Sequence, residues 1–164
     1  MLFRSRFRPT SELSRLNATA GRPMAVSPLL WAVLAAGLDA ASRTHGLFDP
    51  TVLAAMQAAG YDRPFAELVD GRTGASYRLE LRREGWRSVR LDPQGHTVLL
   101  PAGVGIDLGG IAKGWLADYV ADTLAAHGPA LVDMGGDIAA RGAPGDQPGW
   151  ARSEEHTSEL QSRG

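Results

Sequence analysis

Residues 106–114 read Ile-Asp-Leu-Gly-Gly-Ile-Ala-Lys-Gly and place an aspartate, a double glycine and a lysine at the predicted start of a helix. The first amides of a helix lack intrahelical partners and lie at the positive end of its dipole, so they favour phosphate groups. Lys113 adds a compact positive charge, and Asp107 adds a carboxylate. The pattern predicts an anion site. An ordinary strand-to-helix turn with a solvated lysine would show the same residues.

Lys113 is the only lysine among the 17 basic residues of the chain, and the other sixteen are arginines. Because the two side chains are not interchangeable, this choice indicates a role for a point-charge ammonium. Two familiar phosphate motifs do not match. A P-loop needs Ser or Thr after Gly-Lys, whereas Gly114 follows here, and the third glycine of a dinucleotide fingerprint would fall at Leu108.

Strands and a helix are predicted around these residues. Residues 104–108 have the apolar character of a short buried strand, and 130–134 predict a second strand before another double glycine. Asp137 follows that second double glycine, and residues 138–141 predict a further strand. A helix that ends at Gly128 is predicted from apolar residues at helical spacing: Ile111, Leu116, Tyr119, Val120, Thr123 and Leu124.

Cap residues predict the helices of the first half. Ser27 followed by Pro28 predicts a helix that runs to about Thr44 and is ended by Gly46. Asp49 followed by Pro50 predicts a second helix, ended by Gly60. Three weaker elements are also predicted: a helical turn within 9–17 capped by Ser11 or Thr10, a mixed strand at 77–82, and a hairpin of 86–91 with 96–100 around the loop 92–95.

Composition bounds the class of protein. The chain has 164 residues, 44% hydrophobic and 21% charged, which suits one globular domain or part of one. A formal net charge of −1 gives no electrostatic case for nucleic acid. No apolar run reaches the roughly 18–20 residues that span a bilayer. The absence of cysteine excludes disulfides and thiol chemistry within this sequence.

The sequence changes character near its end. Residues 152–162 read Arg-Ser-Glu-Glu-His-Thr-Ser-Glu-Leu-Gln-Ser, which resembles the translation of a common sequencing-library adapter. We therefore expect residues 1–151 to be a partial domain and 152–164 to be an artefactual tail. On this interpretation His156 and its neighbouring glutamates are not metal ligands.

Four motifs in order resemble the ApbE family, the FAD:protein FMN transferases. They are residues 11–17 (Ser-Glu-Leu-Ser-Arg-Leu-Asn), 48–51 (Phe-Asp-Pro-Thr), 107–114 and 135–138 (Gly-Gly-Asp-Ile). The resemblance covers roughly residues 4 to 150. It implies an α+β fold with a T-fold-like core of antiparallel strands and helices, incomplete here and truncated at both ends.

The resemblance also implies an activity and site residues. Family members cleave the FAD diphosphate with Mg²⁺, join FMN to a Thr or Ser hydroxyl of a target protein and release AMP. By carry-over, Asp107 and Lys113 fall at FAD-contacting positions, and Gly110 falls where a backbone carbonyl binds Mg²⁺. Gly60 and Tyr61 fall in an aromatic segment that lines the flavin or adenine pocket. The usual tryptophan of that segment is Ala59 here.

The resemblance places the remaining site after residue 151. By resemblance, the Asp and Thr side chains that bind Mg²⁺ and the catalytic residues lie in that later part. The chain as given is therefore predicted not to transfer FMN. It also suggests an extracytoplasmic, membrane-associated lipoprotein. Two other functions remain open: an FAD-binding module that does not transfer, such as an FAD hydrolase, and a structural or interaction domain with glycine turns.

Overall fold

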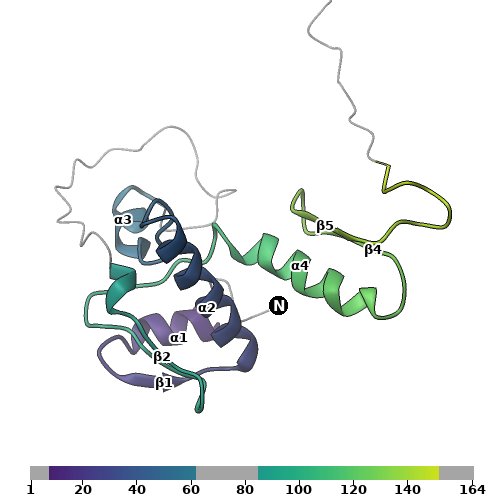
Figure 1. Ribbon diagram of the computed structural model, residues 1–164. Helices are drawn as coiled ribbons and strands as arrows, with labels where there is room; N and C mark the ends of the chain where they lie inside the picture. Colours follow the sequence, from purple (N-terminus) through teal and green to yellow (C-terminus); the bar gives the residue numbers. More distant parts are fainter. Residues whose placement is uncertain (1–7, 62–84, 152–164) are drawn as a thin grey trace, which may run out of the picture. The chain divides into compact units, whose positions relative to one another are not determined.

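The computed structural model describes residues 8–61 and 85–151, and these residues belong to two compact units that divide between residues 115 and 116 (Figure 1). The predicted strand at 77–82, the arginines at 4 and 6, and the predicted tail at 152–164 lie outside the described residues. In the part of the chain that is described, no helix has the length and apolarity needed to cross a membrane. Each unit is described separately below.

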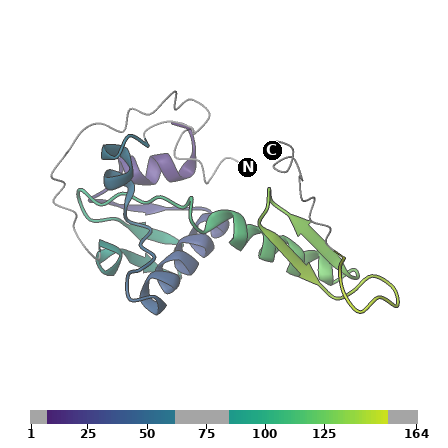
Figure 2. The same ribbon diagram turned by 90° about the horizontal axis from the view of Figure 1, so that it is seen from above.

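Within residues 8–61 and 85–115, the first unit contains α-helices α1, α2 and α3, a short 3-10 helix and a three-stranded antiparallel sheet (Figures 1 and 2). The strand order is β1-β3-β2, so β3 is central. The elements in chain order are α1 (Glu12–Ala18), β1 (Pro23–Ala25), α2 (Pro28–Arg43), α3 (Leu53–Ala58), η2 (Gly85–Ser88), β2 (Arg90–Asp92) and β3 (Thr97–Leu99). This mixture of helices and antiparallel strands confirms the predicted α+β class.

Aliphatic side chains from helices, sheet and loop form one buried cluster in this unit. Its fully buried members are Leu13, Leu16, Leu30, Val33, Val98, Leu100 and Ile106. Burying a side chain of this size contributes roughly 1.5–3 kcal/mol, so this cluster is the main source of stability in the unit. It packs α1, α2 and the sheet against the segment that carries Asp107.

Local capping explains where α1 and α2 begin and end. The Ser11 and Ser27 hydroxyls accept hydrogen bonds from the amides of Ser14 and Leu30, and Pro28 is the first residue of α2, as predicted. Gly46 was predicted to end α2, but it does not do so alone. His45, with φ +53°, already takes the left-handed conformation, and the Gly46 amide, one residue later, donates to the Ala41 carbonyl.

Several predicted elements of the first unit were wrong in extent. The helix predicted from Asp49 begins at Leu53, because the Asp49 carboxylate accepts from the Thr51 amide and hydroxyl and forms a tight turn. Residues 85–88 form η2, so the predicted hairpin keeps only β2 and β3, with its loop at 93–96. Strand β1 was not predicted.

Residues 104–108 are buried as predicted at Val104, Ile106 and Leu108, but they do not form a strand. They make a single isolated parallel bridge, between Val52 and Gly105. The reason is that their backbone groups bond to several different places in the fold. The Ile106 groups pair with a side chain, and the Asp107 amide donates to the Pro50 carbonyl at 2.8 Å.

The second unit contains most of α4 (Ala112–Ala125) and a hairpin of β4 (Ala130–Asp133) with β5 (Ile138–Arg141). The helix and both strands were predicted, but the buried face of the helix was not. Tyr119 and Leu124 are 51% and 45% exposed, whereas the small cluster under the hairpin consists of Ala117, Ala121, Val132 and Ala139. The predicted face was right for Leu116, which is buried, and for Val120, which packs against this cluster, and wrong for Tyr119 and Leu124, because the hairpin packs on the alanines of α4.

Candidate functional site

In the segment 104–113, buried apolar residues alternate with, and are followed by, residues that reach the surface. Side chains at Val104, Ile106 and Leu108 are buried in the core of the first unit. Asp107 is half-buried, whereas Gly109, Gly110 and Lys113 are exposed. The alternation holds the motif residues at the surface of a well-packed unit, where a ligand can reach them.

Asp107 is oriented by its own turn. Its Oδ1 accepts a hydrogen bond from the Gly109 amide at 2.7 Å. A Cβ at 109 would lie 2.9 Å from the same oxygen, closer than real Cβ contacts, so any larger residue there would displace the carboxylate. The turn therefore fixes the direction of the carboxylate, which can accept hydrogen bonds from hydroxyl or N–H groups of a ligand.

The amides at the start of α4 already have partners within the chain. The Ile111 and Ala112 amides donate to the Leu108 carbonyl at 3.1 and 2.9 Å, and the Gly109 amide donates to Asp107. The anion site predicted from these amides is therefore not open in this conformation at those three positions. Lys113, the second residue of α4, provides exposed positive charge to the motif.

Gly110 lies against Phe48, which belongs to the motif at 48–51. A Cβ at position 110 would lie 3.1 Å from Phe48 Cε2, so an alanine requires the ring to move by a few tenths of an ångström. The contact also shows that two of the four motifs pack together in the first unit.

Gly60 and Tyr61 end α3 rather than lying on a helix. The Gly60 and Tyr61 amides donate to the carbonyls of Gln57 and Met56, which is the pattern of a Schellman cap. Gly60 has φ +91°, and Tyr61 is 41% exposed at the edge of the described residues. An exposed ring suits stacking with an aromatic ligand, and its role remains a prediction.

Asp137 and the second double glycine belong to the second unit. The amides of Gly135 and Gly136 both donate to Asp133 Oδ1 at 2.8 Å. The Asp137 carbonyl accepts from the Met134 amide at 2.9 Å and closes the hairpin. The carboxylate that organises this turn is thus Asp133, to which the sequence analysis gave no role.

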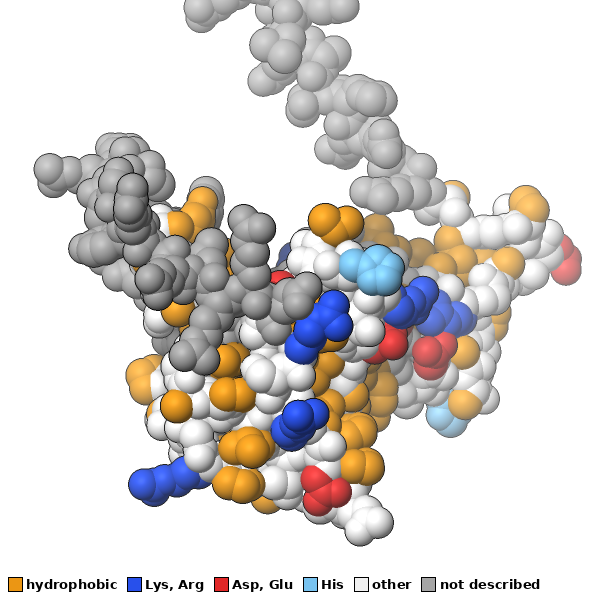
Figure 3. All heavy atoms as spheres, turned by 60° about the vertical axis from the view of Figure 1, so that its left-hand side comes forward, with side chains coloured by type: hydrophobic (Ala, Val, Ile, Leu, Met, Phe, Trp, Pro, Cys, Tyr) orange, Lys and Arg blue, Asp and Glu red, His pale blue; other side chains and the backbone are white. Residues whose placement is uncertain are grey.

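Acidic side chains are few on the face of the molecule shown in Figure 3. Within 8–61 and 85–151, no three His, Cys, Asp or Glu side chains lie together as metal ligands would. Mg²⁺ is bound by oxygen ligands that usually include carboxylate. The predicted Gly110 carbonyl ligand remains a prediction.

Sequence reasoning missed the contacts that hold the site. Asn17 bonds to the backbone of Ile106, and Pro50 bonds to that of Asp107. Both residues lie in motifs that carried the family resemblance, but no local pattern identifies their partners, since the partners are 89 and 57 residues away.

Comparison with known proteins gives a consistent result. Residues 4–156 match the model of the ApbE family. The chain is 39% identical over 141 residues to a FAD:protein FMN transferase of Treponema pallidum, a match that covers 82% of this chain and 39% of the relative. It is 32% identical over 154 residues to one of Vibrio cholerae, with 89% and 44% covered. The chain thus spans less than half the length of these curated relatives.

Solved structures agree with the fold. The ApbE protein of Thermotoga maritima superposes with a TM-score of 0.73 at 26% identity, covering 87% of this chain and 47% of that one. The flavin transferase ApbE of Vibrio cholerae gives 0.68 at 30% identity, covering 87% and 46%. With the family model matching nearly the whole sequence, the chain belongs to the ApbE family.

Proposed function

We propose that the protein containing this chain is a Mg²⁺-dependent FAD:protein FMN transferase. It moves FMN from FAD to a Thr or Ser hydroxyl of a target protein and releases AMP. The observation that carries the proposal is the family match together with the fixed, surface-presented segment Asp107 to Lys113. The named relatives support the reaction type.

The reaction forms one phosphoester bond, to the acceptor, and breaks one phosphoanhydride bond, within the FAD diphosphate. The acceptor hydroxyl loses its proton, its oxygen bonds to the phosphorus of the FMN half, and the bond to the AMP oxygen breaks. Such reactions are catalysed mainly by positioning and by neutralising charge on the phosphates. Mg²⁺ held in part by the Gly110 carbonyl would neutralise some of this charge.

Residues of this chain act at the substrate-binding end of the reaction. Lys113 contributes positive charge near the diphosphate from the first turn of α4. Asp107, fixed by the Gly109 amide, accepts hydrogen bonds from FAD and so sets its orientation. Tyr61 provides an exposed ring at the end of α3 for stacking with the isoalloxazine or adenine.

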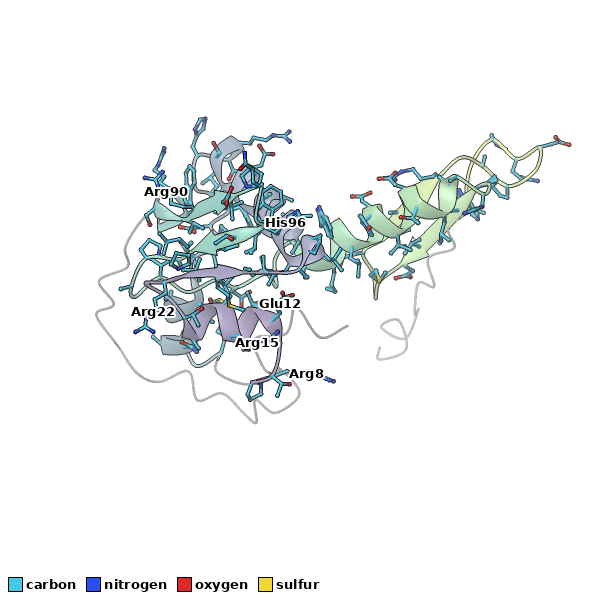
Figure 4. The ribbon with its side chains drawn as sticks, turned by 90° about the horizontal axis from the view of Figure 1, so that it is seen from below. Arg8, Glu12, Arg15, Arg22, Arg90 and His96 are labelled. Carbon is cyan, nitrogen blue, oxygen red and sulfur yellow. The ribbon has the colours of Figure 1, made fainter. Side chains whose placement is uncertain are left out.

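Titration of FAD fluorescence with the full-length protein tests this assignment. Lys113→Ala and Asp107→Ala should each weaken FAD binding roughly ten- to a hundredfold, the value of one charge-assisted contact. Arg22→Ala is the matched control, because it removes one exposed charge outside the motif (Figure 4). Unchanged affinity in both motif variants would return Asp107 and Lys113 to a structural role.

A transfer assay tests the reaction itself. The full-length protein is mixed with FAD, Mg²⁺ and a domain carrying an acceptor threonine, and the acceptor is weighed by mass spectrometry. An added FMN with stoichiometric AMP supports transfer. Release of both FMN and AMP with an unmodified acceptor would instead establish an FAD hydrolase.

A further inference from the structure

The backbone immediately before Asp107 is held by one side chain. The Asn17 amide nitrogen donates to the Ile106 carbonyl at 2.9 Å, and the Ile106 amide donates to Asn17 Oδ1 at 2.7 Å. The two residues are 89 positions apart. A carboxamide is well suited to this contact, because it offers a donor and an acceptor side by side.

The contact replaces the strand pairing that this segment lacks. Ile106 is 0% exposed, so its N–H and C=O groups need partners inside the protein. One residue later, the Asp107 amide donates to the Pro50 carbonyl at 2.8 Å. The backbone of the candidate FAD-binding carboxylate is therefore fixed on one side by Asn17 and on the other by Pro50.

Asn17 is itself carried by a rigid element. It lies near the end of α1, whose Leu13 and Leu16 are fully buried in the core. The same helix makes a second contact of this kind at its start, where the Glu12 carboxylate accepts from the Ser27 amide and hydroxyl. Glu12 thus fixes the start of α2, whereas Asn17 fixes the segment that carries the site.

We propose that Asn17 is a positioning residue for FAD binding, acting through the backbone of Ile106 on the placement of the Asp107 carboxylate. The proposal rests on the proposed function, since Asp107 is assigned there to FAD. Asn17 itself bonds to the protein backbone, and α1 provides the fixed base from which it holds the segment. A displacement of about 1 Å at a recognition group is enough to reduce its effect by as much as a hundredfold.

The test compares Asn17→Ala with Glu12→Ala in the full-length protein. Each variant removes a side chain of α1 that makes two hydrogen bonds to a distant segment, but only the first releases the segment before Asp107. At a temperature where circular dichroism shows both to be folded, FAD fluorescence titration should give a dissociation constant about ten- to a hundredfold higher for Asn17→Ala and one within about threefold of the unsubstituted protein for Glu12→Ala.

Amide hydrogen exchange gives a second readout that general destabilisation does not reproduce. In Asn17→Ala the amides of Ile106 and Asp107 should exchange faster than the core amides of α2, and in Glu12→Ala they should keep their relative protection. If Asn17→Ala does not fold, Asn17→Asp and Glu12→Gln form the replacement pair. Asn17→Asp keeps the oxygen acceptor and loses the donor to Ile106, so its affinity for FAD should also fall.

The outcomes separate this inference from the proposed function. If the unsubstituted protein binds FAD and the Asn17 variants bind it equally well, or if the Glu12 variants lose as much affinity, the positioning role is overturned alone. If the unsubstituted protein does not bind FAD, the proposed function is overturned and the inference with it. Selective loss in the Asn17 variants supports both.

Discussion

The pattern Asp-x-Gly-Gly occurs twice in this chain, at residues 107–110 in the first unit and at 133–136 in the second. In both, the aspartate Oδ1 accepts a hydrogen bond from the amide of the first glycine, at 2.7 Å and 2.8 Å. The glycines are nevertheless needed for different physical reasons, which only the surroundings of each turn reveal.

The first pair is favoured by limited space. Neither Gly109 nor Gly110 has a positive φ, but a Cβ on them would lie 2.9 Å from Asp107 Oδ1 and 3.1 Å from Phe48 Cε2. The second pair is required by conformation. Gly135 and Gly136 have φ of +78° and +95°, and a Cβ on either would meet nothing within 4 Å.

The same residue pair therefore serves two kinds of structure. Two consecutive residues with positive φ make the tight turn that joins β4 to β5, with strand twist matched across it. The crowded pair instead lets Phe48 and the Asp107 carboxylate approach the start of α4. A shared motif in sequence does not imply a shared site.

The largest effect is expected from replacing both glycines of the hairpin turn. Gly135→Ala with Gly136→Ala should destabilise the second unit by roughly 2–4 kcal/mol, because each alanine is forced into the left-handed region at about 1–2 kcal/mol. Chemical unfolding followed by the NMR signals of Val132 and Ala139 would measure it. Gly135→Asn with Gly136→Asn is the control and should cost clearly less, because asparagine tolerates this region; an equal cost would show that space, not conformation, is limiting.

Gly110→Ala should have the next largest effect, about 1–2 kcal/mol on the stability of the first unit, through overpacking against Phe48. The diagnostic is a double-mutant cycle with Phe48→Leu, measured by chemical unfolding. The leucine should recover most of the cost of the alanine by giving it room. Strict additivity of the two substitutions would mean that the ring does not limit residue 110.

Asp133→Ala should cost roughly 1 kcal/mol in the second unit, since it leaves the Gly135 and Gly136 amides to water at an exposed turn. Asp133→Asn retains the accepting oxygen and is the matched control. Chemical unfolding of the two variants would compare them. Equal losses would show that the carboxylate charge, and not its hydrogen bonds, holds the turn.

The smallest effect is expected at the ion pairs that join the hairpin to α4. Arg141, which is partly buried, donates to the exposed Asp122 at 2.6 Å and to the exposed Asp118 at 3.0 Å. The hydrogen bond from Arg141 holds the pKa of Asp122 below its ordinary value of 3.8. The Arg141–Asp122 pair therefore contributes to stability above pH 3.8, the ordinary pKa of Asp122. This contribution is lost as the pH falls through the lower pKa that Asp122 has in the folded protein.

Thermal unfolding of Arg141→Gln checks this assignment. The variant should unfold at a slightly lower temperature near neutral pH in low salt, and the difference should shrink in high salt because exposed ion pairs are screened. It should also shrink below the folded-state pKa of Asp122. A difference that is independent of both salt and pH would assign the role of Arg141 to packing of its side chain.

The sequence by itself determined the features that depend on neighbouring residues. Ser11 and the pair Ser27-Pro28 begin α1 and α2 where the cap pattern predicts, since a cap bonds within three residues. Helix α4, which ends at Ala125 shortly before Gly128, and the hairpin of β4 with β5 were also predictable. The order of four motifs was sufficient to indicate the family that the comparisons then showed.

Only the tertiary structure decided the features that depend on distant partners. Residues 104–108 are buried at alternate positions as their composition predicts, but they form no strand. The backbone groups of Ile106 bond to Asn17, and the Asp107 amide bonds to Pro50, so these groups are not available to a neighbouring strand. β1 exists only because it pairs with β3, as an edge strand that tolerates Pro23 at its first position.

The buried face of α4 shows the same limit. Residue size predicted Tyr119 and Leu124 on the inside, but the hairpin packs where Ala117 and Ala121 let its backbone come close. The hydrophobicity of a side chain is a local property, whereas its burial depends on which other element packs against it. The placement of Asp107 is decided in the same way, by Pro50, which bonds to Asp107, and by Asn17, which bonds to Ile106 from 89 residues earlier in the chain. No local pattern specifies either partner.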